Sequence, residues 1–564
     1  MKYTLSREVR RYILISLWLN NFKKQRVLFS SSALFIFCGF VCFFQSVFLF
    51  FLAKIQKFSI FIFIYLKYFK SIDFYYDWIY NHSIGEVIYM VNVKKKTSFT
   101  EGGLFFKILL FAIPVMLTGA LQTCYNMADH MVVGRFSDDA NALAAIGCTT
   151  SLTSLFVNFL LGIATGGGVV IAQTFGAKQY DDLSKAVHTA ITVSFIGGAL
   201  FSFLGLTLSR PALILMKTDA AILDSATLYI RIICLGIPAL SVYNFGAAIF
   251  RSIGDSKTPL IILGTTGLVN VGLNILFVVV FSMAVEGVAI ATIVAQYLSA
   301  VAVLTLLVAR KNTPYALSFK KLCIEKRSLT RILRLGVPAG IQSSFFSVSN
   351  VFMSSALNTF PPSTISARTI ANNLDAISYN LAHGFNAATL TAVGQNYGAR
   401  KPDRMLKSFI YSFILAIGIV FCLSNTMVLF DDTIIGIFVK DTNPERDAIY
   451  VAAKELMNVM LPLYFICGIM EAGGGSCRGF GYSLTPMIAT MVGTCVFRIV
   501  WVFTVFPLES FHTPAGLYTI YPITWGVTGI FHCTLFLIAT FKLIKKLKKE
   551  KAQSESAELI LNAK

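Results

Sequence analysis

Long apolar runs recur along this chain and constrain its fold more than any other feature. From residue 104 onward twelve runs follow one another, and each approaches or exceeds the roughly 20 residues with which a helix crosses a bilayer. They cover residues 104–128, 142–172, 187–209, 228–250, 259–283, 287–309, 332–357, 369–395, 408–430, 450–475, 484–507 and 523–541. With 56% hydrophobic residues, 13% charged residues and a mean hydropathy of +0.70, a soluble enzyme is excluded. The pattern predicts an all-α polytopic membrane protein with twelve transmembrane helices.

The positive charge of the chain indicates how these helices are oriented. Its 48 Lys and Arg against 28 Asp and Glu give a net charge of +20. Basic residues gather in the even-numbered loops, among them Lys178, Arg251, Arg310, Arg400 and Arg478. Because Lys and Arg accumulate on the cytoplasmic side of short loops, we expect a multi-pass protein of the inner (cytoplasmic) membrane with both termini of the core in the cytoplasm. No basic face with interleaved aromatic residues indicates a nucleic-acid partner, so membrane lipids are the expected contact.

The first 89 residues differ in composition from the rest. They hold 15 of the 50 Phe residues, crowded with Ile, Tyr and Lys. Residues 28–52 are long and apolar enough for one extra helix. Alternatively, the stretch resembles translated AT-rich non-coding DNA, and Gly85-Glu86-Val87 is compatible with a ribosome-binding sequence just before Met90. We favour the second interpretation, treat residues 1–89 as a doubtful extension and assign them no function.

The two halves of the chain repeat one another. KILLFAIPVMLTGALQ at 107–122 aligns with RILRLGVPAGIQSSFF at 331–346, AQTFGAK at 172–178 with GQNYGAR at 394–400, and FRSIGDSKTPLI at 250–261 with CRGFGYSLTPMI at 477–488. Six helices in each half make the repeat parallel, which predicts two pseudo-symmetric six-helix bundles around a cleft and transport by alternating access. The predicted organisation is an N-terminal bundle at 90–310, a cytoplasmic basic linker at 311–330, a C-terminal bundle at 331–545 and a cytoplasmic tail at 546–564. One such chain can transport as a monomer, and the sequence leaves the oligomeric state open.

The repeated motifs also point to a family. YNMADHMVVGRF at 125–136, AQTFGAKQ at 172–179, FRSIGDSKTP at 250–259, VNVGLN at 269–274 and GVAIATIVAQ at 287–296 resemble, in their order and spacing, the multidrug and toxic compound extrusion (MATE) family. The resemblance covers about residues 100–545. It implies a MATE-like fold and a secondary active antiporter that exports small amphipathic, often cationic, organic compounds in exchange for H+ or Na+.

A candidate cation-coupling site lies in the first half. Asp129 is an acid inside an apolar run, where ionisable residues are expensive and functional by default. The resemblance matches Asn126 and Asp129 to the family's acidic cation site. The family pattern N-x-x-x-D reads Asn270-x-x-x-Asn274 here, with Thr292 at the sixth-span position. Since an amide replaces the second carboxylate, the choice between H+ and Na+ stays open, and so does a purely structural role as interhelical hydrogen bonds.

Three charged residues in the second half are further candidates. We expect Glu471 and Arg498, on sequential antiparallel spans, to pair as a structural lock or as part of a substrate or gating site. Asp375 is expected near the outer mouth, where it would attract cations or end a helix in solvent. His383 and His532 are expected to be hydrogen-bonded core residues.

Other functional classes fit the sequence less well. A flippase for lipid-linked saccharides from the same superfamily of folds is the second candidate. It ranks below the exporter because its cleft should be rich in cationic residues, whereas Arg498 is the clearest deep cation in this sequence. An intramembrane transferase would need clustered acids for Mg2+, and a channel would need a ring of polar groups. The 11 cysteines show no CxxC pair, so we expect neither a disulfide scaffold nor a zinc site. No cofactor besides the coupling ion and no enzyme activity are expected.

Overall fold

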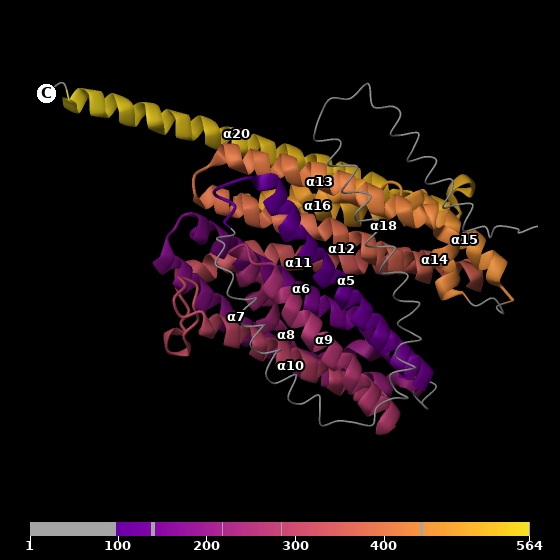
Figure 1. Cartoon of the computed structure of the whole chain (residues 1–564). Coiled ribbons are helices and arrows are strands. Elements are labelled where there is room, and N and C mark those ends of the chain that lie inside the picture. Colours follow the sequence, from indigo (N-terminus) through magenta and orange to yellow (C-terminus); the bar gives the residue numbers. More distant parts are fainter. Residues whose placement is uncertain (1–97, 137–141, 217, 284, 440–443, 563–564) are drawn as a thin grey trace, which may run out of the picture. The chain divides into compact units, whose positions relative to one another are not determined.

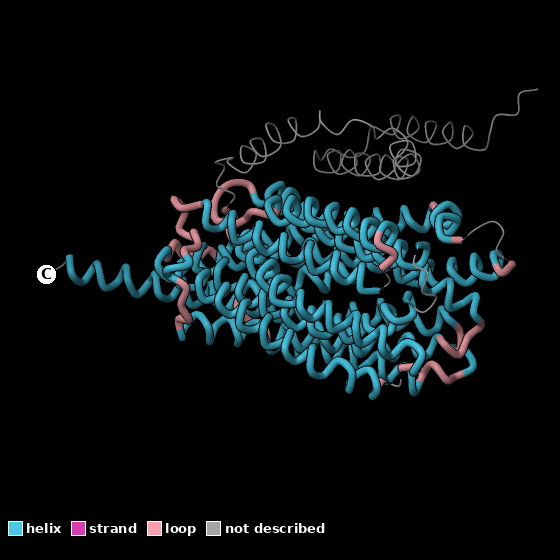
Figure 2. The backbone as a smooth tube through the Cα atoms, turned by 90° about the horizontal axis from the view of Figure 1, so that it is seen from below, coloured by secondary structure: helices cyan, strands magenta, loops and turns pink. Residues whose placement is uncertain are grey.

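The described part of the chain consists of helices that run side by side. A computed structural model describes residues 98–136, 142–216, 218–283, 285–439 and 444–562, all within the second of two units, Gly85–Lys564. The extra helix predicted at residues 28–52 lies outside these residues. Figures 1 and 2 show the helices lying along one common direction, with the loops gathered at both ends. This arrangement is that of a polytopic helical membrane protein.

Each half contributes six spans. The first half contains α5 (Leu104–Phe136), α6 (Ala142–Gly176), α7 (Tyr180–Leu215), α8 (Ala220–Ser252), α9 (Lys257–Ile275) continued by the π-helical η2 (Leu276–Val280), and α10 (Val285–Ala309). The second half contains α11 (Lys326–Leu357), α12 (Pro362–Gly398), α13 (Pro402–Leu429), α14 (Asp431–Phe438), α15 (Arg446–Met460), α16 (Tyr464–Phe480), α17 (Leu484–Thr490), η4 (Met491–Val496), α18 (Phe497–Thr504), α19 (Pro514–Tyr518) and α20 (Ile520–Asn562). The 3-10 turns η3 (Phe319–Lys321) and η5 (Glu509–Phe511) lie in connections.

The twelve predicted spans all correspond to helices. Nine helical segments of the described residues are long and apolar enough to cross a membrane, and α15 with α16 makes a tenth, bent by 44° at a break that contains Pro462. The remaining two spans are α11 and α12, whose lengths suffice but whose sequences are rich in Ser, Asn and Thr. Both of these polar helices line the cavity between the two halves.

The first helix of each half packs against the second helix of the other half. In the described residues α11 packs most extensively on α6, while α5 packs on α12 and on α9 (Figure 1). Glycines permit the close crossing of α6 and α11, because a methyl group at Gly162 or Gly166 would overlap the backbone at Gly340 or Gly336. Gly162 and Gly166 therefore permit close packing of α6 on α11.

The two halves meet at the end where α6 and α12 terminate, which we call the closed end. Gln173 of α6 donates a hydrogen bond from Nε2 to the carbonyl of Gly479, 3.0 Å away, and Gln395 of α12 donates one to the carbonyl of Ser252, 2.8 Å away. Gln173 and Gln395 occupy equivalent repeat positions. The two bonds therefore form a pseudo-symmetric seal between the halves.

The side-chain amide oxygens of both glutamines in the seal also accept hydrogen bonds. Gln173 Oε1 accepts a hydrogen bond from Arg331 at 2.7 Å, and Gln395 Oε1 accepts one from the backbone N–H of Phe99 at 2.8 Å. A glycine lies one turn further along each helix, and a methyl group there would overlap the carbonyl oxygen of the opposite glutamine. The seal thus depends on both the amide groups and the missing side chains.

Irregular π-helical turns occur in both the fifth and the eleventh span, which are equivalent in the repeat, but at different positions along them. The π-helical η2 directly follows the helix that carries Asn270 and Asn274, and η4 directly precedes Arg498. Single π-turns inside helices shift the side chains that flank them and occur often at functional sites. Both turns here adjoin residues that the sequence singles out.

Candidate functional site

A cavity of about 520 Å³ lies between the two halves. Its walls come from α5, α6 and α8 of the first half and from α11, α12, α16, α18 and α20 of the second. Polar and aromatic side chains alternate on these walls. The lining includes Asn158, Thr165, Asn244, Arg251, Gln342, Ser343, Asn350, Asp375, Tyr379, Asn380, His383, Asn386, Tyr464, Glu471, Arg478, Arg498, Tyr521 and Trp525.

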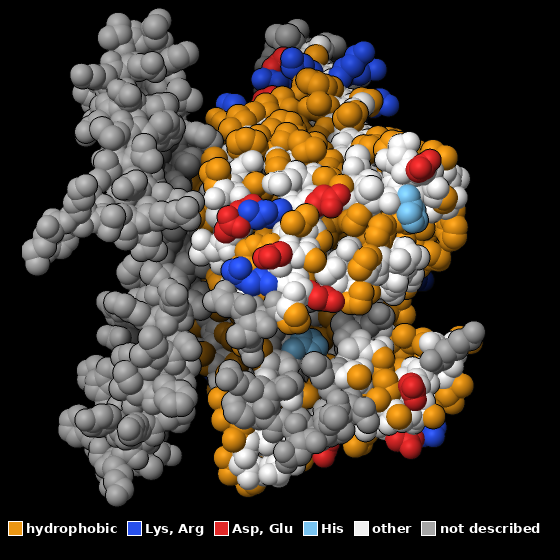
Figure 3. Space-filling view, turned by 90° about the vertical axis from the view of Figure 1, so that its right-hand side faces the viewer, with side chains coloured by type: hydrophobic (Ala, Val, Ile, Leu, Met, Phe, Trp, Pro, Cys, Tyr) orange, Lys and Arg blue, Asp and Glu red, His pale blue; other side chains and the backbone are white. Residues whose placement is uncertain are grey.

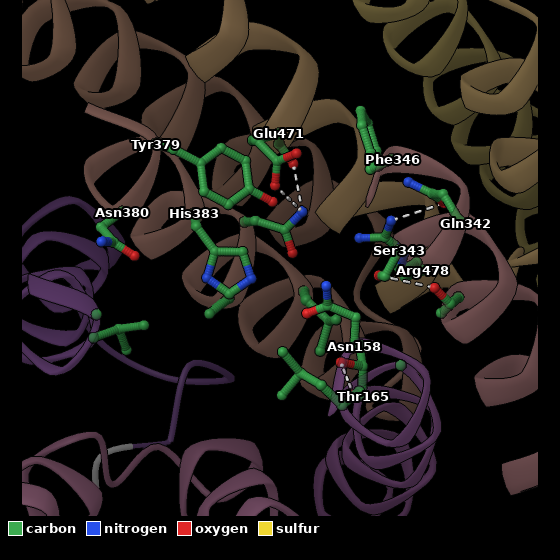
Figure 4. A pocket seen from close by; sticks show the side chains of 18 of the residues that line it. Asn158, Thr165, Gln342, Ser343, Phe346, Tyr379, Asn380, His383, Glu471 and Arg478 are labelled. Atoms are coloured by element: carbon green, nitrogen blue, oxygen red, sulfur yellow. Dashed lines mark hydrogen bonds between the residues drawn. The ribbon is translucent and has the colours of Figure 1, made fainter. Parts of the chain in front are cut away.

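Two equivalent arginines line the cavity next to the seal. Arg251 directly precedes Ser252, whose carbonyl accepts from Gln395, and Arg478 directly precedes Gly479, whose carbonyl accepts from Gln173. The cavity therefore ends at the closed end on a floor that carries two guanidinium groups. Figure 4 shows Arg478 facing Gln342, to which its Nη2 donates a hydrogen bond of 3.1 Å.

Glu471 is held against α12. Its carboxylate accepts a 2.8 Å hydrogen bond from Asn386 Nδ2, and the same amide donates to the Glu471 backbone carbonyl at 3.1 Å. Tyr379 and His383 of α12 lie beside Glu471 in Figure 4, with Asn158 and Thr165 of α6 across the cavity. This wall offers donors and acceptors from both halves.

A second polar group lies further from the floor. Tyr464 donates a hydrogen bond of 2.7 Å to the carboxylate of Asp375. The Arg498 guanidinium stands 4.0 Å from the centre of the Tyr521 ring and donates to Asn350 at 3.4 Å. Asp375 and Arg498 both line this part of the cavity, and no ion pair joins them within the described residues.

Three expectations from the sequence are corrected here. Glu471 and Arg498 form no ion pair within the described residues, since Glu471 is held by Asn386 and Arg498 by Tyr521 and Asn350. Asp375 lines the cavity and bonds to Tyr464, so it is no solvated helix end at the mouth. Arg251 and Arg478, assigned to loops, belong to the last turns of α8 and α16 and line the cavity, so Arg498 is one of three deep arginines.

The histidines occupy different environments. His532 is buried, and its ring nitrogens lie 3.2 Å from Thr490 Oγ1 and 3.3–3.4 Å from the carbonyls of Pro486 and Met470, as expected of a hydrogen-bonded core residue. His383 instead lines the cavity, with its ring 5.9 Å from that of Tyr379. Only the second therefore faces the space in which a transported molecule would bind.

The candidate coupling residues form a cluster in the first half. Asn274 Nδ2 donates to Asp129 Oδ1 at 2.5 Å and lies 3.5 Å from Asn270 Oδ1, while Asn270 Nδ2 lies 3.4 Å from Thr292 Oγ1. Asn274 is fully buried and Asn270 is 5% exposed. The i, i+4 spacing places the two amides on one face of α9, opposite the carboxylate on α5.

One member of the predicted set stands apart. The Asn126 side chain is exposed and makes no hydrogen bond to the cluster within the described residues. A buried acceptor also remains without a donor, because Asn274 Oδ1 has no hydrogen-bond partner there. An unsatisfied buried oxygen beside a carboxylate is costly unless a proton or a cation joins them. The cluster does not line the central cavity, but α5 contributes to both sites.

Several residues that close or shape the site are not identified by the sequence. Gln173, Gln395, Asn386 and Tyr464 make the contacts that close or shape the site. The signal that identifies some of them was the internal repeat, which aligns the two glutamines and also Arg251 with Arg478. No three His, Cys, Asp or Glu side chains of the described ranges come together as a metal site would require.

Comparisons with known proteins agree with this architecture. The probable multidrug resistance protein YoeA of Bacillus subtilis is 27% identical over 391 residues, 68% of this chain and 82% of that protein. The probable multidrug resistance protein NorM of Thermotoga maritima is 24% identical over 401 residues, 70% of this chain and 84% of that protein. A crystal structure of a MATE protein in complex with MaD3S superposes with a TM-score of 0.73, at 19% identity, over 80% of this chain and 99% of that one.

The family model MatE matches this chain twice, at residues 114–276 and 338–504. Each match falls in one half of the repeat, and together they cover more than half of the sequence. The two halves, the twelve helices and the central cavity accord with that assignment. The chain therefore belongs to the MatE family of multidrug and toxic compound extrusion transporters.

Proposed function

We propose that this protein is a secondary active antiporter that exports amphipathic organic compounds in exchange for H+ or Na+. The observation that carries this proposal is the double use of α5: it holds Asp129 in the buried cluster with Asn274, and its residues Thr118 and Gln122 line the central cavity. An ion bound at Asp129 and a molecule bound in the cavity would therefore act on the same helix.

The positions of the basic loops support an orientation of the molecule in the membrane. Arg310, Lys320 and Lys321 lie between α10 and α11, and Arg400 and Lys401 follow α12, all at the closed end. The tendency of Lys and Arg to stay on the cytoplasmic side places the closed end in the cytoplasm of the inner membrane. The structure then corresponds to a state that faces outward, sealed against the cell interior. Figure 3 views the opposite end, where acidic and basic side chains are scattered among apolar and uncharged ones.

The chemistry of the cluster supports both coupling ions. A protonated Asp129 could donate a hydrogen bond to Asn274 Oδ1 if the Asn274 amide group rotated by 180°. That hydrogen bond would supply the donor that Asn274 Oδ1 now lacks. A sodium ion would instead use the oxygens of Asp129, Asn270, Asn274 and Thr292, because hard cations prefer oxygen ligands. In either case the bound ion neutralises the one carboxylate of the cluster.

Exchange then requires that the ion and the substrate favour different states. Neutralising Asp129 changes the contact between α5 and α9, and α5 also packs on α12 of the other half. A change at that contact is expected to loosen the outward-facing arrangement after the substrate has left. The inward-facing state would form when the seal at Gln173 and Gln395 opens.

The test is uptake of ethidium into everted membrane vesicles that contain the full chain. We expect accumulation under either a proton gradient or a sodium gradient, and its loss in Asp129→Asn with dye binding preserved. Asp224→Asn is the matched control, because Asp224 is exposed and its ion pair within the described residues is with Arg210 at the surface. Accumulation that is unchanged in Asp129→Asn would reject Asp129 as the coupling site. No accumulation of ethidium or of the zwitterionic dye rhodamine B under either gradient would reject the exporter.

A lipid-linked saccharide flippase is the second candidate, and the three arginines that line the cavity favour it. The two functions differ in what crosses the membrane. A flippase is expected to translocate a fluorescent lipid-linked saccharide in proteoliposomes and to leave ethidium behind. The exporter is expected to do the reverse.

A further inference from the structure

The positive and negative side chains that line the cavity are unequal in number. Three arginines line it, Arg251, Arg478 and Arg498, against two carboxylates, Asp375 and Glu471. Burying a charge in a membrane protein is expensive unless an opposite charge lies near it. The question is therefore which arginine has no carboxylate to balance it.

Two of the arginines are balanced. Asp375 and Arg498 interact electrostatically, and so do Glu471 and Arg478. Arg478 also donates to Gln342, and Arg498 donates to Asn350 and stacks on Tyr521. Each of these guanidinium groups thus has a carboxylate within electrostatic range and at least one direct polar contact.

Arg251 has neither. Within the described residues its guanidinium makes no hydrogen bond and no ion pair, and the groups that interact with it electrostatically are the Tyr243 phenol and the His383 ring, neither of which is a carboxylate. The negative end of the α8 helix dipole lies close, since Arg251 belongs to the last turn of α8, but it supplies only a fraction of a charge. An uncompensated cation therefore lies at the floor of the cavity.

The surroundings of Arg251 fit an anionic group. His383 lies close enough to interact electrostatically with both Arg251 and Arg478. The hydroxyls of Thr165 and Thr391 line the same cavity, and the tyrosines Tyr379, Tyr464 and Tyr521 with Trp525 provide aromatic walls further out. The site combines a cationic floor with an apolar and aromatic upper part. Such a cavity is complementary to an amphipathic molecule that enters with its anionic end first.

We propose that the floor of the cavity is an anion subsite in which Arg251, assisted by Arg478, binds a carboxylate or phosphate of the transported molecule. The substrate class is then amphipathic molecules that carry an anionic group, zwitterions included, and compounds with a cationic group alone bind less well. This inference rests on the proposed export function and specifies its substrate. The subsite also adjoins the seal, because Arg251 is followed by Ser252 and Arg478 by Gly479.

The test uses two dyes that differ by one negative charge. Rhodamine B carries a free carboxylate, and its ethyl ester has the same chromophore without it. Binding of each dye to the purified full-length protein is followed by fluorescence anisotropy, and transport is followed in everted vesicles. We expect the wild type to bind the carboxylate dye more tightly than the ester. Arg251→Gln is expected to lower the affinity for the carboxylate dye at least about tenfold and to change the affinity for the ester little.

Two variants control for folding and for general loss of charge. Arg251→Lys keeps the charge and is expected to retain most of the preference for the carboxylate dye. Arg210→Gln removes an exposed arginine outside the cavity and is expected to change neither dye. Addition of dodecyl phosphate tests the source of the anion: displacement of the carboxylate dye indicates that a lipid phosphate fits the same subsite, and absence of displacement restricts the subsite to carboxylates.

The outcomes separate this inference from the function on which it rests. Equal affinity of the wild type for both dyes, or equal loss of both dyes in Arg251→Gln, overturns the anion subsite and leaves the exporter in place. Failure of the wild type to bind or transport either dye counts against the exporter, and the subsite is then rejected with it.

Discussion

Gln173 and Gln395 occupy equivalent positions of the two halves, and each donates a hydrogen bond to a backbone carbonyl that belongs to the other half. Each side-chain amide oxygen also accepts a hydrogen bond, from Arg331 at Gln173 and from the backbone N–H of Phe99 at Gln395. The two residues thus act as a pair across the pseudo-twofold axis. Because a transporter must break this contact once in each cycle, the seal has to be strong enough to hold and weak enough to open.

The glutamines are predicted to set the population of the sealed state. Gln173→Ala with Gln395→Ala removes both interdomain hydrogen bonds and leaves the carbonyls of Gly479 and Ser252 without these donors, which disfavours the sealed state by about 1–3 kcal/mol for each bond. Spin labels at Lys185 and Lys407, both exposed near this end, are expected to show a longer distance in the double variant. The measurement is electron–electron double resonance in a background whose native cysteines are replaced by serine.

An exposed glutamine provides the control for that experiment. Gln179 lies just beyond α6, and its side chain takes no part in the seal. Gln179→Ala should leave the distance distribution unchanged. An unaltered distribution in the double variant as well would show that the hydrogen bonds do not hold the closed end.

The glycines of the seal are predicted to be equally sensitive. Gly176→Ala places a methyl group against the carbonyl oxygen of Gln395, so the two helix ends must separate. Gly147→Ala is made on the same helix, where nothing lies within 4 Å of the added methyl group. We expect the first variant to lose most ethidium transport and the second to keep it, because alanine also favours the helix. Normal transport by Gly176→Ala would contradict the close contact.

Tyr464 is predicted to stabilise the second half through Asp375. The tyrosine is 1% exposed, and it lies directly after the bend between α15 and α16, which brings its hydroxyl to α12. Tyr464→Phe removes a hydrogen bond to a partly buried carboxylate and is expected to cost about 1–3 kcal/mol. The change is measured as a lower Tm of the purified protein in detergent.

The control is a tyrosine whose hydroxyl binds no carboxylate. Tyr482 is 41% exposed, and its hydroxyl makes no hydrogen bond within the described residues. Tyr482→Phe should leave Tm almost unchanged. Equal Tm values for the two variants would mean that the Asp375 contact contributes nothing to stability.

The positions of the helices follow from the sequence far more directly than their lateral packing does. Apolar runs of bilayer length predict all twelve spans, because each helix must satisfy its own backbone within the membrane. The packing of α5 on α12 and of α11 on α6 depends instead on which helix surfaces fit together. Gly162 and Gly340 are small enough to meet, but nothing local to either residue identifies the other.

The candidate site shows the same limit. Spacing on one helix predicts that Asn270 and Asn274 share a face, and an intramembrane acid draws attention to Asp129; the structure brings all three together. Asn386 and Tyr464 could not be identified, because their roles depend on carboxylates of other helices. Charges near helix ends were the main source of error. Arg251 has the sequence context of a loop residue, and only the tertiary fold places it in the cavity.

Ion binding at Asp129 is proposed to be coupled to substrate export, and a substrate gradient that drives the ion tests this coupling most directly. Proteoliposomes with the full-length protein receive an ethidium gradient and no ion gradient, and internal pH and internal sodium are recorded with separate indicators. The account predicts that the dye gradient drives one of the two ions in the opposite direction and that this flow disappears in Asp129→Asn but persists in Asp224→Asn. Dye movement without ion movement, or ion flow that survives in Asp129→Asn, would contradict it.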